Sequence, residues 1–151
     1  MKLCVASDTH GNTDAIRQMI TREMPDTVLF LGDGVDEMIR ETKRYGVGCA
    51  LVAGNCDLFC AEPYTREVEF EGIRIFMTHG HRFGVKQGLA DLASAVLQSG
   101  CAYGLFGHTH QYYEGKLHGI TLYNPGSLGM KKSYLVAELA NGKAVWRKVE
   151  L

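Results

Sequence analysis

The stretch "KLCVASDTHGNTDAIRQMITRE" at residues 2–23 decides the fold, because it joins a buried strand to a helix through a polar turn. Residues 2–7 form an apolar run that predicts a strand with both faces buried. Asn12 can cap a helix over residues 13–23, where apolar side chains recur at helical spacing. A strand followed by a helix is typical of a parallel sheet.

The same alternation continues downstream of this stretch. Apolar runs at 26–32 and 48–55 predict two more buried strands, and we expect a helix near 36–45 between them. Three buried strands joined by helical crossovers form βαβ units. Asp36 stands where the second helix is expected to begin, so helix capping explains it as well as a functional role does.

The second half of the chain predicts a second sheet. Residues 65–72 and 73–80 form a hairpin around a Glu-Gly turn, and an amphipathic helix over 85–100 is stopped by Gly100. Further strands are expected at 101–107, 111–115, 119–123, 133–139 and 143–149. The sequence therefore predicts an α/β fold of two packed sheets with helices outside.

Length and composition limit the class of protein. A chain of 151 residues that is 46% hydrophobic predicts a single domain over residues 1–151 with a substantial core. The net charge of -1, with no block of like charges, argues against a strong nucleic-acid-binding surface. No apolar stretch approaches the ~20 residues that span a membrane, so we expect no membrane association.

The cysteines and the N-terminus indicate a cytoplasmic location. Five cysteines are an odd number, none forms a CxxC pair, and three lie in apolar runs where a free thiol packs as a small hydrophobic group. A tetrathiolate zinc site is therefore not expected. The N-terminal run reaches Asp8 too soon for a signal peptide.

Polar side chains collect directly after the apolar runs. Five of the six histidines fall in the tracts 7–12, 78–81 and 107–110, and the tracts 32–36 and 54–57 add Asp and Asn. In open α/β sheets, ligands bind in the crevice outside the carboxyl ends of the strands. We therefore expect the five tracts to converge in space.

Each tract also has a simpler interpretation when it is considered alone. A Gly-Asp pair is usually a turn, Asn12 can be only a helix cap, and a His-x-His pair is often a surface feature. His118, in a late hairpin, is interpreted as a surface or turn histidine. These separate interpretations do not explain why the other histidines are confined to the strand ends, and a functional site does.

The residue types in the tracts indicate transition-metal binding. Imidazole and carboxylate ligands with one amide suit Mn, Fe, Ni or Zn, whereas Ca or Mg prefers oxygen ligands alone. The candidates are sufficient for two metals ~3.5–4 Å apart if one carboxylate bridges them. The candidate ligands are Asp8, His10, Asp33, Asn55, His79, His108 and His110. Side chains two residues apart on an extended segment point the same way, so His108 and His110 can face one pocket.

Five sequence blocks carry a resemblance to a known family. They are "DTH", "GDGVD", "GNCD", "THG" and "GHTH", in this order between residues 8 and 110. The set resembles the signature of the calcineurin-like metallophosphoesterases. The short length and the "NPGS" at 124–127 are most similar to the small YfcE-like phosphodiesterase branch.

This resemblance implies a fold, an activity and a ligand assignment. The implied fold is a four-layer α-β-β-α sandwich of two mixed sheets flanked by helices. The implied activity is hydrolysis of a small phosphodiester or phosphate ester by a metal-bridging hydroxide, often with manganese. By similarity, the first metal is held by Asp8, His10 and His110, the second by Asn55, His79 and His108, and Asp33 bridges both.

The chain departs from the larger family at Cys56, where that family has a histidine thought to help the leaving group depart; the small branch also has cysteine there. His81 is the candidate substitute, so Asp33, Asn55 and His81 are the residues expected to act in the reaction.

The alternatives to this enzymatic function are a non-catalytic scaffold, as in a eukaryotic retromer subunit that resembles this branch, and a purely structural metal site. A scaffold tends to lose ligands, and all seven are present here. The substrate, the native metals, a possible homo-oligomer and the role of residues 124–127 stay open.

Overall fold

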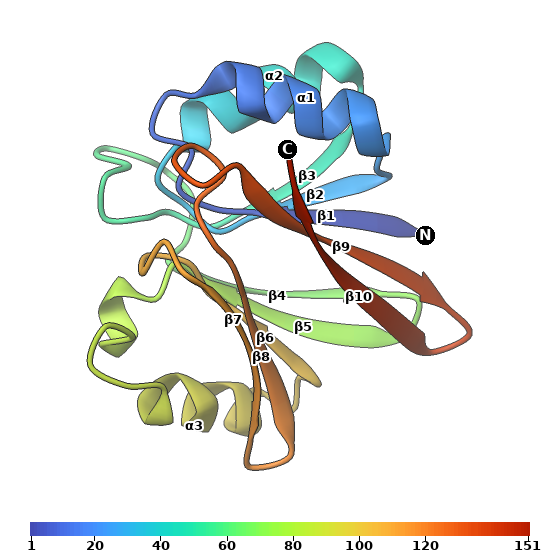
Figure 1. The fold of residues 1–151 in the computed structure, drawn as a ribbon. Helices are drawn as coiled ribbons and strands as arrows, with labels where there is room; N and C mark the ends of the chain where they lie inside the picture. The colour runs from blue at the N-terminus through green and yellow to red at the C-terminus, as the bar shows by residue number, and fades with distance from the viewer.

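The computed structural model describes residues 1–151 as two five-stranded sheets that lie between layers of helices (Figure 1). The first sheet contains, in spatial order, β10 (Lys143–Glu150), β9 (Ser133–Ala140), β1 (Lys2–Ala6), β2 (Thr27–Phe30) and β3 (Gly48–Leu51). Strands β1, β2 and β3 are parallel to one another, and β9 runs antiparallel to β1. The carboxyl ends of the three parallel strands therefore lie at one edge of this sheet.

The second sheet combines three parallel strands with two antiparallel ones. It contains, in spatial order, β4 (Thr65–Phe70), β5 (Ile73–Thr78), β6 (Tyr103–Leu105), β8 (Ile120–Pro125) and β7 (Tyr112–Leu117). Strands β5, β6 and β8 are parallel, whereas β4 and β7 are antiparallel additions at the two edges. The predicted hairpin between β4 and β5 is confirmed, with its turn at Glu71 and Gly72, both at positive φ.

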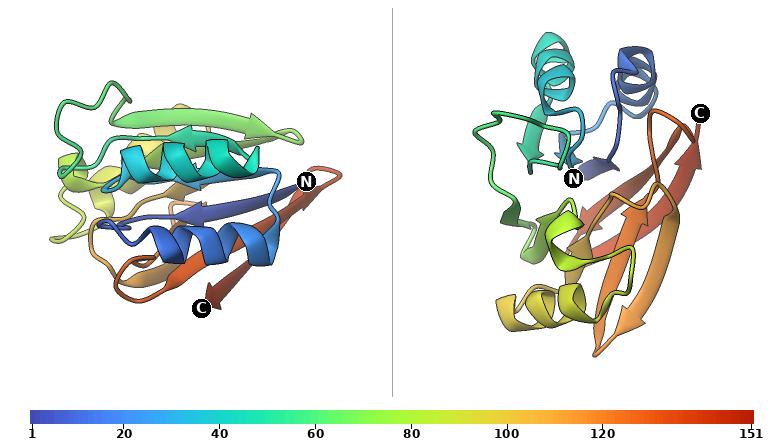
Figure 2. Two further views of the ribbon diagram at one scale, coloured as in Figure 1. Left: turned by 90° about the horizontal axis from the view of Figure 1, so that it is seen from above. Right: turned by 90° about the vertical axis from the view of Figure 1, so that its left-hand side faces the viewer.

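Three helices complete the layers. Helices α1 (Thr13–Glu23) and α2 (Val35–Tyr45) lie side by side over the first sheet, and α3 (Ala90–Ser99) covers the outer face of the second (Figures 1 and 2). The predicted order of helix, sheet, sheet and helix is confirmed. The Asn12 cap is confirmed as well, because its side-chain oxygen accepts the Ala15 N–H at 3.1 Å.

Alternation along β1 explains why its sequence is apolar throughout. Leu3 and Val5 pack in the cluster between the two sheets, and Cys4 and Ala6 pack in the cluster beneath α1 and α2. Both faces of the strand are therefore buried, as its apolar run predicts. A third apolar cluster joins α3 to the second sheet.

The helix predicted over residues 85–100 is too long at its N-terminal end. The Gln87 and Gly88 N–H groups both donate to the Gly84 carbonyl, at 2.9 and 3.2 Å, and close a separate turn. Gly84 has a left-handed φ of +60°, which breaks helical continuity with the 3₁₀ turn His81–Phe83 before it. Only Ala90–Ser99 is α-helical, and Gly100 ends it as predicted.

The capping role considered for Asp36 is wrong. Gly34 is the N-cap residue of α2 and Asp36 lies in its first turn. The Asp57 carboxylate caps the helix instead, because it accepts the N–H groups of Gly34 and Val35 at 2.9 and 3.0 Å. The cap comes from a distant loop, so the local sequence could not reveal it.

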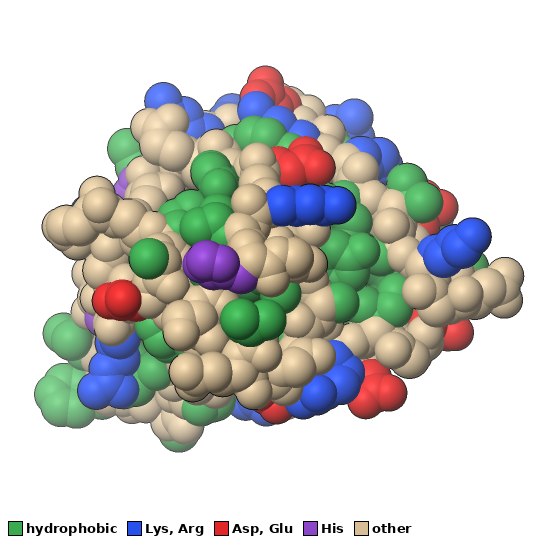
Figure 3. Space-filling model, turned by 90° about the horizontal axis from the view of Figure 1, so that it is seen from below, with side chains coloured by type: hydrophobic (Ala, Val, Ile, Leu, Met, Phe, Trp, Pro, Cys, Tyr) green, Lys and Arg blue, Asp and Glu red, His purple; other side chains and the backbone are tan.

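The surface agrees with the composition. None of the helices is long and apolar enough to cross a membrane. On the face in Figure 3, both Lys and Arg and Asp and Glu side chains are present, scattered mainly around the rim. All five cysteines are unpaired, and Cys4 and Cys101 are buried. His118 occupies the exposed turn between β7 and β8, as expected.

Candidate metal centre

The five polar tracts converge at the carboxyl ends of the parallel strands, as predicted. Asp8 follows β1 and Asp33 follows β2, and the Asp8 N–H donates to the Gly32 carbonyl at 2.9 Å. His79 follows β5, and its carbonyl accepts the N–H of Gly107 beyond β6 at 2.9 Å. Side chains from both sheets therefore meet at one edge of the sandwich.

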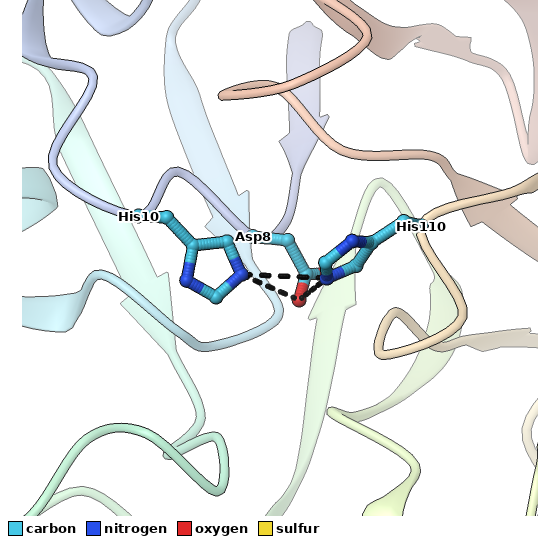
Figure 4. Close-up of side chains that lie close together, drawn as sticks. All are labelled: Asp8, His10 and His110. Atoms are coloured by element: carbon cyan, nitrogen blue, oxygen red, sulfur yellow. Dashed lines mark hydrogen bonds and ion pairs between the residues drawn. The ribbon is translucent and has the colours of Figure 1, made fainter.

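Asp8, His10 and His110 form the first group of potential ligands (Figure 4). The Nε2 atom of His110 lies 3.1 Å from Asp8 Oδ1, and His10 Nε2 lies 3.6 Å from the same oxygen. The two Nε2 atoms are 3.3 Å apart. Three ligand atoms that face a common point at these separations can surround one cation.

Asp33, His79 and His108 form a second group beside the first. Asp33 Oδ2 lies 3.3 Å from His79 Nε2, which lies 3.2 Å from His108 Nδ1. Asp8 Oδ1 is 3.9 Å from the same His79 nitrogen, and Asp33 Oδ2 is 3.9 Å from His10 Nε2. The two aspartates therefore connect the groups.

Burial and local charge set the ionisation of this cluster. Burial opposes ionisation of Asp33, but the hydrogen bond and charge of His79 and the N–H of Cys56 hold the pKa of Asp33 well below its usual range. Burial lowers the pKa of His79, but its hydrogen bond to Asp33 and the charges of Asp8 and Asp33 outweigh burial and raise it. Burial, and then the charge of His79, lower the pKa of His108.

The second nitrogen of His79 is fixed by the backbone. His79 Nδ1 lies 2.7 Å from the Leu31 carbonyl oxygen, which can only accept, so the proton belongs on Nδ1. This bond orients the ring and turns Nε2 toward Asp33. Histidine ligands in metal sites are held in this way by the nitrogen that does not bind the metal.

The donor set fits a cation. Neither Asp8 nor Asp33 forms an ion pair with Lys or Arg, although both carboxylates are almost fully buried. Two pairs of imidazole nitrogens face each other, and their lone pairs repel unless a proton or a metal lies between them. A divalent ion supplies the positive charge that a buried carboxylate pair requires.

The backbone is held in an uncommon conformation at the same positions. Of the seven predicted ligands, Asp8, His10, Asp33, His108 and His110 have positive φ, between 43 and 68°. Left-handed backbone costs energy at residues other than glycine and collects at functional sites. The fold therefore holds the backbone of five predicted ligands in a conformation that residues other than glycine disfavour.

The structure does not join Asn55 and His81 to this cluster by hydrogen bonds. Asn55 is exposed, and its amide nitrogen lies 3.6 Å from Cys56 Sγ. The ring of His81 lies 5.5 Å from that of His79, and its Nδ1 is buried without a partner. Burial and the charge of His79 lower the pKa of His81. The roles expected for Asn55 and His81 stay predictions.

Sequence reasoning missed the residue that fixes the Asp33 turn. Asp57 accepts the N–H groups of Asp33 and Gly54 at 2.7 Å each, in addition to the two that it accepts at the start of α2. A second acid, Glu37, accepts the Gly11 N–H at 2.7 Å and the Thr9 hydroxyl at 2.8 Å. Both acids lie within or next to the quoted tracts, but apart from Gly54 the backbone amides that they bind come from segments 22 to 26 residues away.

Residues 124–127 support the ligand-bearing tracts. Asn124 donates to the Gly107 carbonyl and to the Thr109 hydroxyl, both at 3.0 Å. The Ser127 hydroxyl donates to the Asp8 carbonyl at 2.8 Å. This segment therefore helps to position the first ligand group through hydrogen bonds to the backbone of its two tracts and to the Thr109 side chain.

Comparison with known proteins assigns the family. Residues 1–142 match the model of the calcineurin-like phosphoesterase superfamily domain. This chain belongs to that superfamily. It is 30% identical to a protein named probable metallophosphoesterase YsnB from Bacillus subtilis, over 97% of this chain and 89% of that protein. It is 29% identical to the Escherichia coli phosphodiesterase YfcE, over 87% of this chain and 82% of that enzyme.

These relatives support the YfcE-like branch, and the chain is a metal-dependent phosphoester hydrolase of the calcineurin-like superfamily. The same fold occurs in a Vps29 single mutant from Entamoeba histolytica, with a TM-score of 0.79, 19% identity, and coverage of 100% of this chain and 99% of that one. At this identity the likeness shows the fold alone. The fold alone therefore does not define the reaction, and the mechanism of this chain has to be inferred from its candidate metal ligands.

Proposed function

We propose that this calcineurin-like protein hydrolyses phosphodiesters at a centre of two divalent transition-metal ions. The observation that supports it is the pair of buried carboxylates, Asp8 and Asp33, which have no Lys or Arg partner and are surrounded by imidazoles. In the proposed assignment, Asp8, His10 and His110 hold one ion, Asn55, His79 and His108 hold the other, and Asp33 bridges them. The donor set suits Mn, Fe, Ni or Zn, with manganese as the first candidate.

Two such ions, when bound, supply a nucleophilic hydroxide at neutral pH and neutralise charge on the phosphoryl group. The residues of the chain would hold these ions in place. Asp33 is held by the Cys56 N–H at 2.8 Å, and His79 is held by the Leu31 carbonyl. The ligands are thus oriented before substrate arrives, which is the arrangement that a metal-dependent hydrolase requires.

The lining of the adjoining cleft favours a diester. A cleft of about 370 Å³ opens beside His10 and Asp33, and none of its eleven lining residues is Lys or Arg. Asp36, Glu37 and Asp57 add acidic groups to this wall. A dianionic monoester would find no cationic side chain there, whereas a monoanionic diester needs less neutralisation. Diesters are therefore expected to react at least as well as monoesters.

His81 is the proposed proton donor to the leaving group. Its ring is 6.1 Å from that of His108, on the second ligand group. A positioned acid contributes ~10²–10⁴-fold, and most for poor leaving groups. The variant His81→Asn is expected to slow alkyl diesters more than aryl diesters, with metal content measured in both proteins. An equal loss on both substrates would remove His81 from this role.

The function is tested by assaying metal-loaded protein against matched phosphodiesters and phosphomonoesters. The proposal expects metal-dependent turnover that chelation abolishes, with diesters no slower than monoesters. A non-catalytic scaffold would turn over neither class, whether or not it binds a structural metal. A preference of orders of magnitude for monoesters would contradict the diester assignment.

A further inference from the structure

Cys56 lies inside the ligand cluster, and the inference drawn from this position rests on the proposed metal centre. Its sulfur, a ring nitrogen of His10 and a carboxylate oxygen of Asp33 all lie within 4.8 Å of one another. The same limit describes the group formed by Asp8, His10 and His110. The sulfur therefore lies within the same limit of two proposed ligands that the three members of that group keep from one another.

The backbone holds Cys56 at this place. Its N–H donates to Asp33 Oδ1 at 2.8 Å, which ties the residue to the carboxylate that is the proposed bridge. The flanking Asp57 carboxylate binds the N–H groups of Asp33 and Gly54 at 2.7 Å each. The loop and the strand end of Asp33 are thus one hydrogen-bonded unit. A side chain fixed in this way is preorganised for binding.

The sulfur has coordination capacity to spare. The thiol makes a side-chain hydrogen bond with the Asp33 carboxylate, and its only other hydrogen-bond contact is the amide nitrogen of Asn55 at 3.6 Å, for which thiol sulfur is a weak acceptor. The other cysteines have different surroundings: Cys4 and Cys101 are buried, and Cys49 packs at the edge of the core. Cys60 lines the same cleft, but its sulfur accepts the backbone N–H of Glu62 at 3.4 Å.

We propose that Cys56 is an additional metal ligand, whose thiolate joins His10 and Asp33 around one of the two ions. On binding, the S–H bond breaks, its proton passes to bulk water, and a sulfur lone pair forms the bond to the metal. A thiolate makes the donor set softer than nitrogen and oxygen alone. The site then prefers zinc, cobalt or cadmium over manganese more strongly than the other ligands would dictate.

Cobalt spectroscopy tests this ligand directly. Co²⁺ bound through sulfur gives a thiolate-to-metal charge-transfer band in the near ultraviolet, whereas nitrogen and oxygen ligands give only visible ligand-field bands. The wild-type protein is expected to show both, and Cys56→Ser to lose the charge-transfer band and keep the visible ones. Cys60→Ser, a matched change in the same cleft, is expected to keep both.

The outcomes separate this inference from the proposed function. Visible bands without a charge-transfer band in the wild type, or a charge-transfer band that persists in Cys56→Ser, overturn the inference and leave the metal centre standing. Absence of any cobalt spectrum overturns the metal centre and the thiolate ligand together.

A measurement on the unmodified chain avoids any folding defect of the variant. Zn²⁺ is expected to protect Cys56 from alkylation by iodoacetamide and to leave the reactivity of Cys60 unchanged, as measured by mass spectrometry of the labelled peptides. Equal labelling of Cys56 with and without saturating Zn²⁺ would overturn the assignment.

Discussion

Two sets of buried carboxylates differ in what surrounds them. Glu23 lies 2.7 Å from Arg147 Nη2, and Glu41 lies 2.9 Å from Arg17 Nε. Both glutamates are held charged, and in each case the partner is a guanidinium that keeps its proton in any protein. These acids are neutralised within the fold and have no need of an external ion.

Asp8 and Asp33 are buried to the same degree, but imidazoles surround them instead. An imidazole can lose its proton and offer a lone pair, which a guanidinium cannot do. The partner of a buried acid, more than its burial, therefore distinguishes an acid that stabilises the fold from one that is available to bind a cation.

The largest effect is expected from Asp33→Asn. Removal of the carboxylate that is proposed to bridge both ions is expected to cost several kcal/mol of transition-state stabilisation, so kcat/KM for a diester should fall by about 10³-fold or more. Glu23→Gln is the matched acid-to-amide control and should keep wild-type kcat/KM. Similar activity losses in the two variants would show that the two sets of acids are not distinct.

Asp57→Asn is expected to weaken metal binding without removal of a proposed ligand. The side-chain amide cannot accept the four backbone N–H groups that Asp57 binds, so the Asp33 turn loses its support. Loss of an outer partner of a ligand typically costs 10–100-fold in metal affinity. Metal titration followed by cobalt absorbance measures this Kd. An unchanged Kd would mean that Asp57 stabilises α2 but does not support metal binding.

Glu23→Gln is expected to lower stability by about 1–3 kcal/mol, because the buried Glu23 carboxylate, which accepts a charged hydrogen bond from the half-exposed Arg147, is replaced by an amide that cannot form this ion pair. Tyr134 can still donate to the amide oxygen, which limits the loss. Urea unfolding of metal-free protein gives the free energy difference. A variant as stable as the wild type would mean that the Glu23 pair contributes nothing to folding.

The smallest effect is a pH dependence of the same pair. Burial opposes ionisation of Glu23, but hydrogen bonds from Tyr134 and Arg147 and the charges of Arg147 and Lys2 hold its pKa below the ordinary 4.5. Because the folded pKa is the lower one, this stabilisation is complete above pH 4.5 and is lost as the pH falls through the folded pKa.

The melting temperatures of metal-free wild type and Glu23→Gln are therefore expected to converge as the pH falls below about 4.5. Measurements between pH 7 and 3 give the comparison. Parallel curves across this range would contradict a depressed pKa for Glu23.

Sequence patterns predicted the strands, the α1 cap and the convergence of the ligand tracts, because apolar runs and the Asn12 cap are local signals. They could not predict the roles of Asp57 and Glu23. The partners of Asp57 lie up to 24 residues away, and Arg147 lies 124 residues from Glu23. The N-terminal end of α3 was misplaced because the Gly84 turn interrupts a pattern that is apolar at helical spacing.

The proposed distinction is that Asp8 and Asp33 bind two metal ions, whereas Glu23 and Glu41 stabilise the fold. Elemental analysis of protein saturated with Mn²⁺ or Zn²⁺ and then freed of excess metal tests it most directly. We expect close to two ions per chain in the wild type and in Glu23→Gln, and loss of both ions together in Asp33→Asn. No bound metal under any loading, or an unchanged metal content in Asp33→Asn, would contradict it.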